Sequence, residues 1–529
     1  MFKCVKKCRE LLMDHDYEVV IIGAGPVGMA MAALLGRFGV HTLVVDRLNA
    51  IQTDPRAIAL DNEALRILAM CGLVLEDLDL VTIPAVNYRS PFFGRFGRMN
   101  TSDSVDTLPP LVTFFQPALE ASLAAQAQVT GSVQVLRGAR AQVIENSEAG
   151  ALVRVHDLED GTERDLKARF VVACDGAGSA TRQSLGVDFL GVSYSQDWLI
   201  VDALNVPESV EEITFYCDPA RPAPHMPAPG GRQRWEFMLH PGESQDEFME
   251  DAKIKDLLRP WTTFEHITLE RKAVYRFHAR LADRFQVGSV FLAGDAAHVT
   301  PPFAGQGLVS GLRDVANLGW KLKAVLRREV SVGVLASYTQ ERKPHAGKMI
   351  RLAQFLGELI MPSSRVKAIF VHGLAKFIGL LPVVHTVFTD MKVKPQNTFD
   401  DGLFLKGGLR GAFAAGAHLP QWWLQTAAGD RKRSDEVFGI RFVCVGINCD
   451  PRRYISEELR QQWQGLGGEF VCLSTPGRAC KFGSDWLVDG KDLPKSEVAL
   501  ILRPDRLILA ASKATRLEVV MQKAIGLLS

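Results

Sequence analysis

Two glycine-bearing turns contain the residues with the clearest chemical meaning in this sequence. The first is Gly23-x-Gly25-x-x-Gly28, which lies between an apolar strand-like run and a helix-forming run. The second begins at Gly294-Asp295 and follows another apolar run. A turn between strand and helix presents free backbone N–H groups to an anion. One such turn indicates a dinucleotide, and two in this order suggest that the dinucleotide is FAD.

The first turn has the context of a dinucleotide-binding signature. Gly23 allows the tight turn, Gly25 lets the backbone approach a pyrophosphate, and Gly28 lets helix and strand pack closely. The second strand ends in Asp46, which can accept hydrogen bonds from a ribose hydroxyl. Two neighbours are assigned to the same cofactor site, Pro26 and Arg47.

A third turn lies between these two, at Asp175-Gly176-Ala177-Gly178. It resembles a degenerate second dinucleotide-binding signature, but Thr181 replaces the glycine that allows close packing, and no strand that ends in an acidic residue follows. We therefore expect Asp175 to cap Gly178, Ser179 or a nearby helix N-terminus.

Composition excludes several function classes. The chain has 529 residues, is 47% hydrophobic and has a net charge of +1. It has no basic stripe for nucleic acid and no uncharged run of the roughly 18 residues that a membrane span needs. Its nine cysteines are scattered without CxxC or zinc spacing, which is typical of free thiols in a reducing cytosol. These features predict a soluble, cytoplasmic protein with no metal, nucleic-acid or membrane partner.

The order of strand-like and helix-like segments predicts a discontinuous first domain that holds a strand-rich insert. We expect a short extension at 1–16, and the first domain at 17–80, 113–190 and 281–360. The insert covers 81–112 and 191–280, a helical linker covers 361–400, and a further α/β unit covers 401–529.

The three turns together resemble those of the single-component, FAD-dependent aromatic hydroxylases, the family of p-hydroxybenzoate and phenol hydroxylases. The resemblance spans residues 17 to 350 and implies that all three turns contact FAD. Pro55-Arg56-Ala57 is similar to the family's segment whose arginine reaches toward the flavin. Gln116 resembles a glutamine that contacts FAD.

The resemblance is strongest to the branch that hydroxylates 3-(3-hydroxyphenyl)propionate and 3-hydroxycinnamate. The matching segments are 55–58, 62–66, 217–222, 236–238, 241–243 and 279–285. Two positions depart from the branch. Phe303-Ala304 replaces a more polar Trp-Gln pair where the substrate ring should sit, and Asp46 replaces the commoner glutamate.

The last 129 residues, 401–529, resemble the family's thioredoxin-like C-terminal appendage. Residues 416–420 and 503–506 carry this likeness, but Cys444 and Cys449 are too far apart for CxxC. We expect a structural module or one that supports a homodimer. The predicted fold class is therefore α/β: a Rossmann-like FAD domain, an inserted β-rich substrate domain and a thioredoxin-like domain.

The resemblance also implies the reaction. NADH or NADPH reduces FAD, oxygen adds to form a C4a-hydroperoxide, and one oxygen atom enters the ring ortho to a phenolic hydroxyl. After Pro302, the backbone of Gly305, Gln306, Gly307 and Leu308 leads into a helix, and its N–H groups are predicted to stabilise the charged reduced flavin.

The phenol also needs a base, because its ionisation at neutral pH costs roughly 4 kcal/mol. The sequence leaves three candidates open, Tyr216, His225 and His240, each of which is more often a structural residue; His298 more plausibly supports its own turn. Three arginines of the insert are candidates for a substrate carboxylate, namely Arg221, Arg232 and Arg234.

These features predict hydroxylation of 3-(3-hydroxyphenyl)propionate or 3-hydroxycinnamate to the 2,3-dihydroxy product. The nearest alternative is the same reaction on another ring, such as a resorcinol, a nitrocatechol or a polyketide, because Phe303-Ala304 departs from the branch. A flavin halogenase is disfavoured because the Trp-x-Trp-x-Ile-Pro element is missing. A non-catalytic FAD-binding protein is the remaining alternative.

Overall fold

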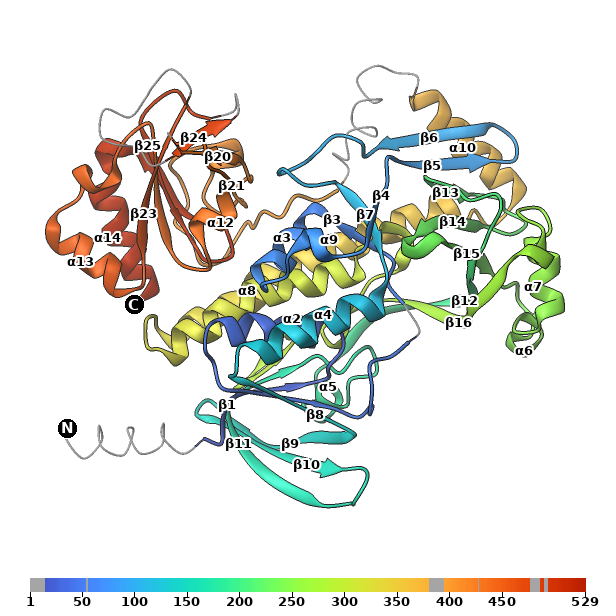
Figure 1. Cartoon of the computed structure of the whole chain (residues 1–529), viewed down its shortest axis with the longest axis horizontal. Coiled ribbons are helices and arrows are strands. Elements are labelled where there is room, and N and C mark those ends of the chain that lie inside the picture. Colours follow the sequence, from blue (N-terminus) through green and yellow to red (C-terminus); the bar gives the residue numbers. More distant parts are fainter. Residues whose placement is uncertain (1–14, 54–55, 380–393, 427, 476–485, 490–492) are drawn as a thin grey trace. The chain divides into compact units, whose positions relative to one another are not determined.

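The structure is a computed structural model that describes residues 15–53, 56–379, 394–426, 428–475, 486–489 and 493–529 (Figure 1). The chain forms two compact units. The first contains residues 1–33, 42–312 and 346–395, and the second contains 34–41, 313–345 and 396–529. The expected N-terminal extension lies outside the described residues up to position 14.

A mostly parallel sheet forms the base of the first unit. Its described strands follow the order β17-β18-β11-β1-β2-β8, and β10 and β9 extend it from β11. The strands are β1 (Tyr17–Ile22), β2 (Thr42–Asp46), β8 (Val133–Arg137), β9 (Ala139–Ser147), β10 (Gly150–Asp157), β11 (Glu163–Ala173), β17 (Gln286–Val287) and β18 (Val290–Leu292). The buried faces of β1, β2 and β11 are rich in valine and isoleucine, as expected for strands covered on both sides.

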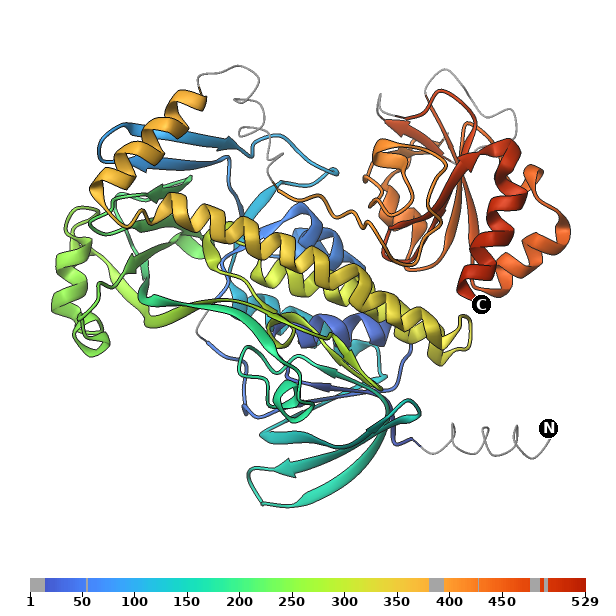
Figure 2. The same ribbon diagram turned by 180° about the vertical axis from the view of Figure 1, so that it is seen from behind.

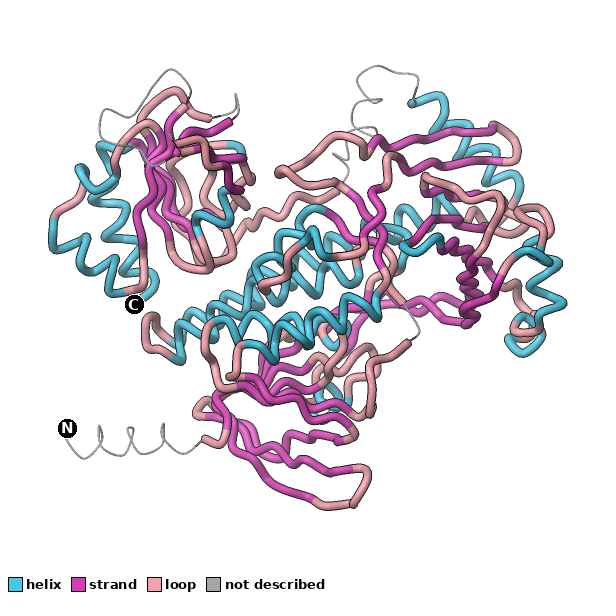
Figure 3. Tube along the Cα trace, in the orientation of Figure 1, coloured by secondary structure: helices cyan, strands magenta, loops and turns pink. Residues whose placement is uncertain are grey.

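Helices connect and cover these strands, and Figure 3 shows them as cyan segments beside the magenta strands. Helix α2 (Pro26–Arg37) follows β1, and α3 (Asn62–Met70) is capped by Asp61, whose side chain accepts the N–H of Ala64. Helices α4 (Gln116–Val129) and α5 (Ala180–Ser184) also belong to the first unit. Helices α8 (Gly307–Leu326) and α9 (Ala336–Ile360) are divided between the two units, because residues 313–345 belong to the second.

A second sheet of the first unit is predominantly antiparallel. Its described strands follow the order β19-β16-β12-β15-β14-β13-β5-β6. They are β5 (Ala85–Ser90), β6 (Gly94–Asn100), β12 (Phe189–Leu204), β13 (Ile213–Tyr216), β14 (Ala223–Ala228), β15 (Arg232–Met238), β16 (Thr268–Ala282) and β19 (His298–Val299). Strands β3 (Ala59–Asp61), β7 (Leu111–Phe114) and β4 (Leu80–Thr82) form a small third sheet.

Two short helices, α6 (Gln245–Phe248) and α7 (Asp251–Leu258), follow β15. Helix α10 (Arg365–Gly379) lies beside the β5–β6 hairpin, as Figures 1 and 2 both show. His372 of α10 shares a hydrogen bond with Ser90, and Lys376 donates to the carbonyl of Phe93. The helix lies within the expected linker, of which residues 380–393 are outside the described part.

The second unit contains a sheet with the described order β21-β20-β24-β23-β22-β25-β26. The strands are β20 (Trp423–Gln425), β21 (Arg431–Arg433), β22 (Val443–Ile447), β23 (Glu469–Ser474), β24 (Trp486–Asp489), β25 (Val498–Leu502) and β26 (Ile508–Lys513), and the helices are α12 (Ser434–Phe438), α13 (Glu457–Gly465) and α14 (Leu517–Leu528). Parallel β22 and β23 are joined through α13, and antiparallel β25 and β26 lead to α14. This βαβ–ββα order is thioredoxin-like.

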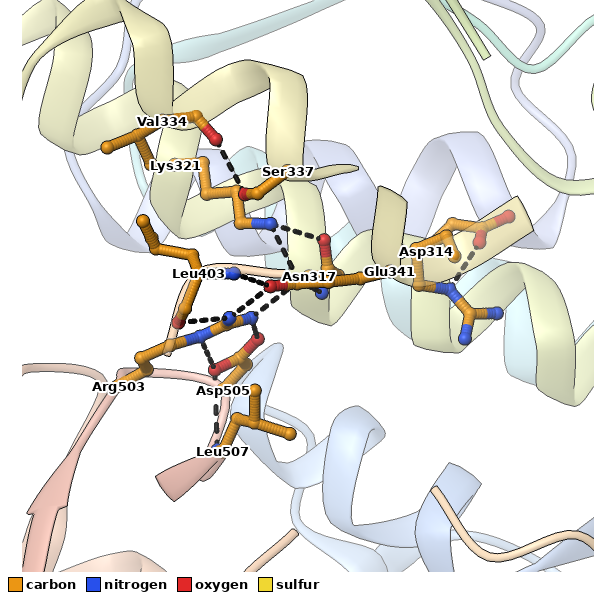
Figure 4. Close-up of polar contacts among 11 residues, drawn as sticks. Asp314, Asn317, Lys321, Val334, Ser337, Glu341, Leu403, Arg503, Asp505 and Leu507 are labelled. Atoms are coloured by element: carbon orange, nitrogen blue, oxygen red, sulfur yellow. Dashed lines mark hydrogen bonds and ion pairs between the residues drawn. The ribbon is translucent and has the colours of Figure 1, made fainter. Parts of the chain in front are cut away.

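A fully buried ion network lies inside the second unit (Figure 4). Both oxygens of Glu341 accept hydrogen bonds from Arg503, at 2.6 and 3.0 Å, and Lys321 donates to Glu341 at 2.8 Å. Arg503 also pairs with Asp505, and Asn317 donates to Glu341 at 2.6 Å. The network therefore ties α8 and α9 to the segment after β25.

The expected fold class is confirmed: an α/β chain with a Rossmann-like sheet, a β-rich insert and a thioredoxin-like C-terminal part. The six described cysteines are free thiols. None of the described helices combines the length and the hydropathy that a membrane crossing requires.

Candidate cofactor and substrate site

The three turns singled out in the sequence meet at one edge of the parallel sheet. Strand β11 pairs in parallel with β1 on one side and with β18 on the other. The turns at 23–28, 174–178 and 294–298 each follow the carboxyl end of one of these neighbours. Ligands of open α/β sheets bind outside the carboxyl ends of the strands. The topology therefore assembles one site from three segments that are distant in sequence.

Glycines allow these segments to approach closely. A Cβ atom at Gly23 would lie 2.4 Å from the carbonyl oxygen of Cys174, and one at Gly28 would lie 1.9 Å from the carbonyl oxygen of Gly23. By contrast, a Cβ at Gly25 would meet no protein atom within 4 Å. Gly23 and Gly28 thus allow protein segments to pack, whereas the backbone at Gly25 is open to a ligand.

Asp46 closes β2 beside the first turn. Its Oδ2 accepts the N–H of Ala24 at 2.6 Å, and its Oδ1 accepts the N–H of Leu48 at 2.8 Å. An ionised carboxylate has about four acceptor positions, so two remain for hydroxyl donors. The neighbouring Arg47 is exposed.

Arg182 links the middle turn to the last one, a contact that sequence reasoning missed. Its guanidinium donates to the carbonyl of Ala296 at 3.1 Å and to the carbonyl of Ala177 at 3.0 Å. Within the middle turn, Asp175 accepts the N–H of Thr181 in the first turn of α5. The other oxygen of Asp175 is buried and has no hydrogen-bond partner among the described residues, so a ligand can supply one.

Gln116 holds the segment of Arg56. Its side-chain oxygen accepts the N–H groups of Arg56 and Ala57 at 2.9 and 2.8 Å, and its amide donates to Glu120 at 2.7 Å. Burial raises the pKa of the Glu120 carboxyl, and the Gln116 hydrogen bond opposes that shift. Both ends of the Gln116 amide therefore bind protein groups. The hydrogen bond to the backbone N–H of Arg56 holds that residue in place, while its side chain is exposed.

The last turn places a carboxylate in a confined position. Asp295 is exposed, yet protein atoms surround it closely enough that desolvation raises the pKa of its carboxyl, against the opposing charges of His298 and Arg56. His298 itself is fully buried in β19 and packs against the ring of Phe285.

The segment after Pro302 forms a tight turn and then α8. The N–H of Gly305 donates to the carbonyl of Pro302 at 2.8 Å, so this predicted donor is already used within the turn. Gly307 and Leu308 are the first residues of α8, and their N–H groups have no acceptor within the helix. The side chain of Gln306 is buried and donates to Asp61 at 3.1 Å.

Phe303 belongs to an aromatic cluster between this turn and the antiparallel sheet. The centroid of its ring lies 5.9 Å from the ring centroid of Trp198, 5.8 Å from that of Phe277 and 6.1 Å from that of Tyr194. Ala304 is half-buried beside it. The insert and the segment after Pro302 therefore meet in a buried cluster of aromatic rings.

Comparisons with known proteins agree with this geometry. The sequence matches the family described as FAD binding domain over residues 16–353 and the family described as HcaD C-terminal domain over residues 416–526. The 3-(3-hydroxy-phenyl)propionate/3-hydroxycinnamic acid hydroxylase of Escherichia coli K12 is 33% identical over 462 residues, which are 87% of this chain and 83% of the relative. The chain belongs to the FAD-dependent aromatic hydroxylases.

Solved structures show the same fold. The flavin-dependent monooxygenase PieE, in complex with FAD and substrate, superposes with a TM-score of 0.80 at 20% identity, covering 97% of this chain and 99% of PieE. Aklavinone-11 hydroxylase, with FAD and aklavinone, gives 0.77 at 21% identity over the same shares. This hydroxylase is thus a flavoprotein aromatic monooxygenase that uses FAD, NADH or NADPH, and oxygen.

The residues of the hydroxylase fit FAD. The opening at Gly25 suits a pyrophosphate, the free acceptor positions of Asp46 suit a ribose, and the unpaired oxygen of Asp175 suits a further hydroxyl. Within the described ranges, no three His, Cys, Asp or Glu side chains gather as a metal ion would require.

The three candidate arginines for a substrate carboxylate are already paired in the hydroxylase. Arg221 binds Glu243 with two hydrogen bonds, Arg232 binds Glu270 in the same way, and Arg234 binds Asp202. To hold a substrate carboxylate, any of them would have to exchange or share its protein partner. A carboxylate-binding arginine therefore stays a prediction.

The three candidate bases lie in different surroundings. His225 is buried and stacks on Trp235 at 4.5 Å, and burial lowers its pKa to about 4. The ring of Tyr216 meets that of Trp261 edge-on at 4.4 Å. His240 donates its backbone N–H to Glu243. Among the described residues, the rings that pack against Tyr216 and His225 are those of Trp235 and Trp261, not that of Phe303. The role of the three residues as base therefore also stays a prediction.

Proposed function

We propose that this hydroxylase inserts one oxygen atom ortho to the hydroxyl of 3-(3-hydroxyphenyl)propionate or 3-hydroxycinnamate and releases the 2,3-dihydroxy product. The observation that carries this proposal is the similarity to the Escherichia coli hydroxylase named for these two acids, at 33% identity over 87% of the chain. The aromatic cluster around Phe303 supports a single-ring substrate with apolar faces.

The residues of the cofactor site would share the work of holding FAD. We infer that Gly23, Gly25, Pro26 and Gly28 receive the pyrophosphate and that Asp46 and Arg47 receive the adenosine ribose. Residues of the other segments would complete the site: Arg56, Gln116, Asp175, Gly294, Asp295, Gly307 and Leu308. Bound FAD supplies the electron transfer from NADH or NADPH and the activation of oxygen.

The chain's own groups would prepare the substrate. The N–H groups that lead α8 favour negative charge beside them, by about 0.3–1 kcal/mol when exposed and up to about 2 kcal/mol when partly buried. Phe303 and Trp198 would exclude water from one side of the ring. The small side chain of Ala304 would leave room for the ring or for its substituent.

A second candidate is the same reaction on a different ring. The observation that favours it is the Phe303-Ala304 pair, because both residues are less polar than the Trp-Gln pair of the propionate branch. A change of this pair, where the substrate ring is expected, favours a different ring, such as a resorcinol, a nitrocatechol or a polyketide.

The test is product identification after incubation with FAD, NADH, oxygen-18 gas and 3-(3-hydroxyphenyl)propionate. We expect a dihydroxy acid that carries one labelled oxygen atom, together with NADH oxidation that the substrate stimulates. The second candidate predicts stimulation by another phenol of a panel and none by phenylpropanoids. Both candidates would be contradicted if the protein binds FAD but NADH does not reduce the bound flavin in the presence of any phenol.

We also infer that the protein acts in the cytoplasm, because the described cysteines are free and no disulfide joins them. The proposed partner is a small aromatic substrate. A homodimer is a further proposal, for which the family resemblance is the support. Mass measurement by light scattering tests it.

A further inference from the structure

A buried carboxyl of the antiparallel sheet has no part in the site described so far. Glu236 lies on β15 and is only 7% exposed. No side chain among the described residues forms a hydrogen bond or an ion pair with its carboxyl, whose oxygens are not among the fully enclosed polar atoms of the protein. A mostly buried carboxyl without a hydrogen-bond partner costs free energy, so such a group is usually kept for a reason other than stability.

The pairing of β12 and β15 defines the position of Glu236. Along the two strands, Trp198 faces Met238, Ile200 faces Glu236, and Asp202 faces Arg234. Alternate residues of a strand share one face. Glu236 therefore lies on the same face as Trp198, one position along, and the ring of Trp198 contacts that of Phe303.

The surroundings of Glu236 change from apolar to charged along this face. Toward the last turn lie the rings of Trp198 and Phe303, where the substrate ring is expected. On the other side lies the ion pair of Arg234 with Asp202, which Arg271 of β16 joins at 3.3 Å. The carboxyl thus sits at the border between the ring cluster and a fixed set of charges.

The charges around Glu236 compensate its burial only in part. Arg234 on β15 and Arg271 on β16 favour the ionised form, whereas Asp202 on β12 opposes it. Desolvation is the largest effect and raises the pKa of the Glu236 carboxyl. A carboxylate in this state is a stronger base than one in water, and a general base works best when its pKa approaches the working pH.

Two of the candidate bases found from the sequence, His225 and Tyr216, do not share this position, because both pack against Trp261 on the other face. Trp235 is the neighbour of Glu236 on β15 and points to the opposite face, into the cluster of Leu199, Val201 and Phe237. His225 stacks on Trp235 and therefore belongs to that opposite face as well.

We propose that Glu236 accepts the phenolic proton of the aromatic substrate. In this step the O–H bond of the phenol breaks, its electron pair stays on the ring oxygen, and a new O–H bond forms on a carboxylate oxygen of Glu236. The proton later passes to water, which restores the carboxylate. The step makes the ring electron-rich before oxygen is inserted, and it deepens the proposed function, on which it rests.

The test compares Glu236→Gln and Glu236→Asp with the wild type, and the exposed Glu211→Gln of the same insert serves as the matched control. Wild-type enzyme must first hydroxylate 3-(3-hydroxyphenyl)propionate; if it converts no phenol, the proposed function fails and not this assignment. We expect Glu236→Gln to lower kcat by about 10²-fold or more with little change in KM, because general-base catalysis contributes 10² to 10⁴. Glu236→Asp should recover part of the rate, and Glu211→Gln should match the wild type.

The pH profile distinguishes a base from a structural residue. In the wild type, kcat should fall as pH drops through the raised pKa of Glu236, above the usual carboxyl range of about 4. In Glu236→Gln, the rate should rise tenfold per pH unit toward the phenol's own pKa of about 10, because hydroxide replaces the missing base.

A binding measurement supplies a readout that is independent of turnover. A nitrophenol changes its absorbance when it ionises, so it reports the protonation state of the bound phenol. We expect the wild type to bind it ionised at a pH at which Glu236→Gln binds it protonated, with FAD content and thermal unfolding unchanged. A Glu236→Gln variant with the wild-type pH profile and the wild-type nitrophenol spectrum would overturn the assignment.

Discussion

Val27 of the first turn lies directly against Gly294 of the last one. A Cβ atom built on Gly294 would be 3.0 Å from a methyl group of Val27, and one built on Gly311 of α8 would be 2.5 Å from the same side chain. Three segments therefore interlock around one valine. This contact makes the pyrophosphate turn, the Gly294-Asp295 turn and the start of α8 parts of one rigid cradle.

The glycines of the first turn should separate folding from cofactor binding. In Gly28→Ala, the new methyl group would overlap the carbonyl oxygen of Gly23 at 1.9 Å, so we expect a loss of about 3 kcal/mol or more in stability. In Gly25→Ala, no protein atom lies within 4 Å, so the apoprotein should keep its thermal unfolding temperature while its FAD affinity falls at least tenfold. Calorimetry of the apoprotein and flavin titration measure the two effects. Equal FAD binding by Gly25→Ala and wild type would contradict a pyrophosphate at this turn.

Arg182 should be required for the hydrogen-bonded contact between the middle turn and the last turn. Arg182→Lys keeps the charge but cannot donate to the carbonyls of both Ala296 and Ala177 in the same geometry. One buried carbonyl is then unsatisfied, at a cost of about 1–3 kcal/mol. We expect a lower unfolding midpoint in urea and weaker FAD binding. The exposed Arg164→Lys of β11 is a control, and identical behaviour of the two variants would exclude a linking role.

The local signatures of the cofactor site were predictable from sequence because each depends on a few neighbouring residues. The turn at Gly23 needs only its strand, its glycines and its helix, and all of these are contiguous. The meeting of the three turns was not derivable from periodicity alone, since it depends on β11 pairing with both β1 and β18. Arg182 was missed for the same reason: its acceptor at Ala296 lies 114 residues away.

The substrate side was harder to predict because pairing between distant strands decides which side chains are available. Arg234 is a plausible carboxylate binder in the sequence, but Asp202 on the neighbouring strand already binds it. Glu236 belongs to the segment 236–238 that resembles the branch, but its burial and its face depend on the register of β12 with β15 and could not be predicted from the sequence. The departure at Phe303 was visible in the sequence, whereas its contact with Trp198 required the fold.

Removal of Arg503 from the ion network of the second unit should lower the stability of the protein more than removal of Lys321. Arg503→Met leaves the buried carboxylates of Glu341 and Asp505 without their main partner, and we expect a loss of about 3–5 kcal/mol. Lys321→Met should cost less, because Glu341 keeps both hydrogen bonds from Arg503. Chemical denaturation followed by tryptophan fluorescence measures both. A larger loss for Lys321→Met would contradict the assignment of Arg503 as the main partner.

The same network gives a pH dependence at the alkaline end. Burial lowers the pKa of Lys321 to about 8, below the ordinary lysine value of about 10.4. Between these values the unfolded chain binds a proton that the folded chain has released, so the free energy of unfolding rises with pH across this window. Lys321→Met should remove this rise, and an unchanged slope in the variant would show that another group causes it.

His225 should affect acid stability and leave catalysis almost unchanged. Its pKa is lowered to about 4 by burial, below the ordinary value of about 6.5. As pH falls through this window, the unfolded chain takes up a proton that the folded chain excludes, so the wild type loses stability, by about 3 kcal/mol at most. His225→Phe keeps a ring stacked on Trp235 and should lose less stability between pH 6.5 and 4. Its kcat should stay within a few-fold of the wild type, as expected for a ring on the opposite face from Glu236. A hundredfold fall in kcat, with the acid limb of the pH profile abolished, would instead make His225 the base.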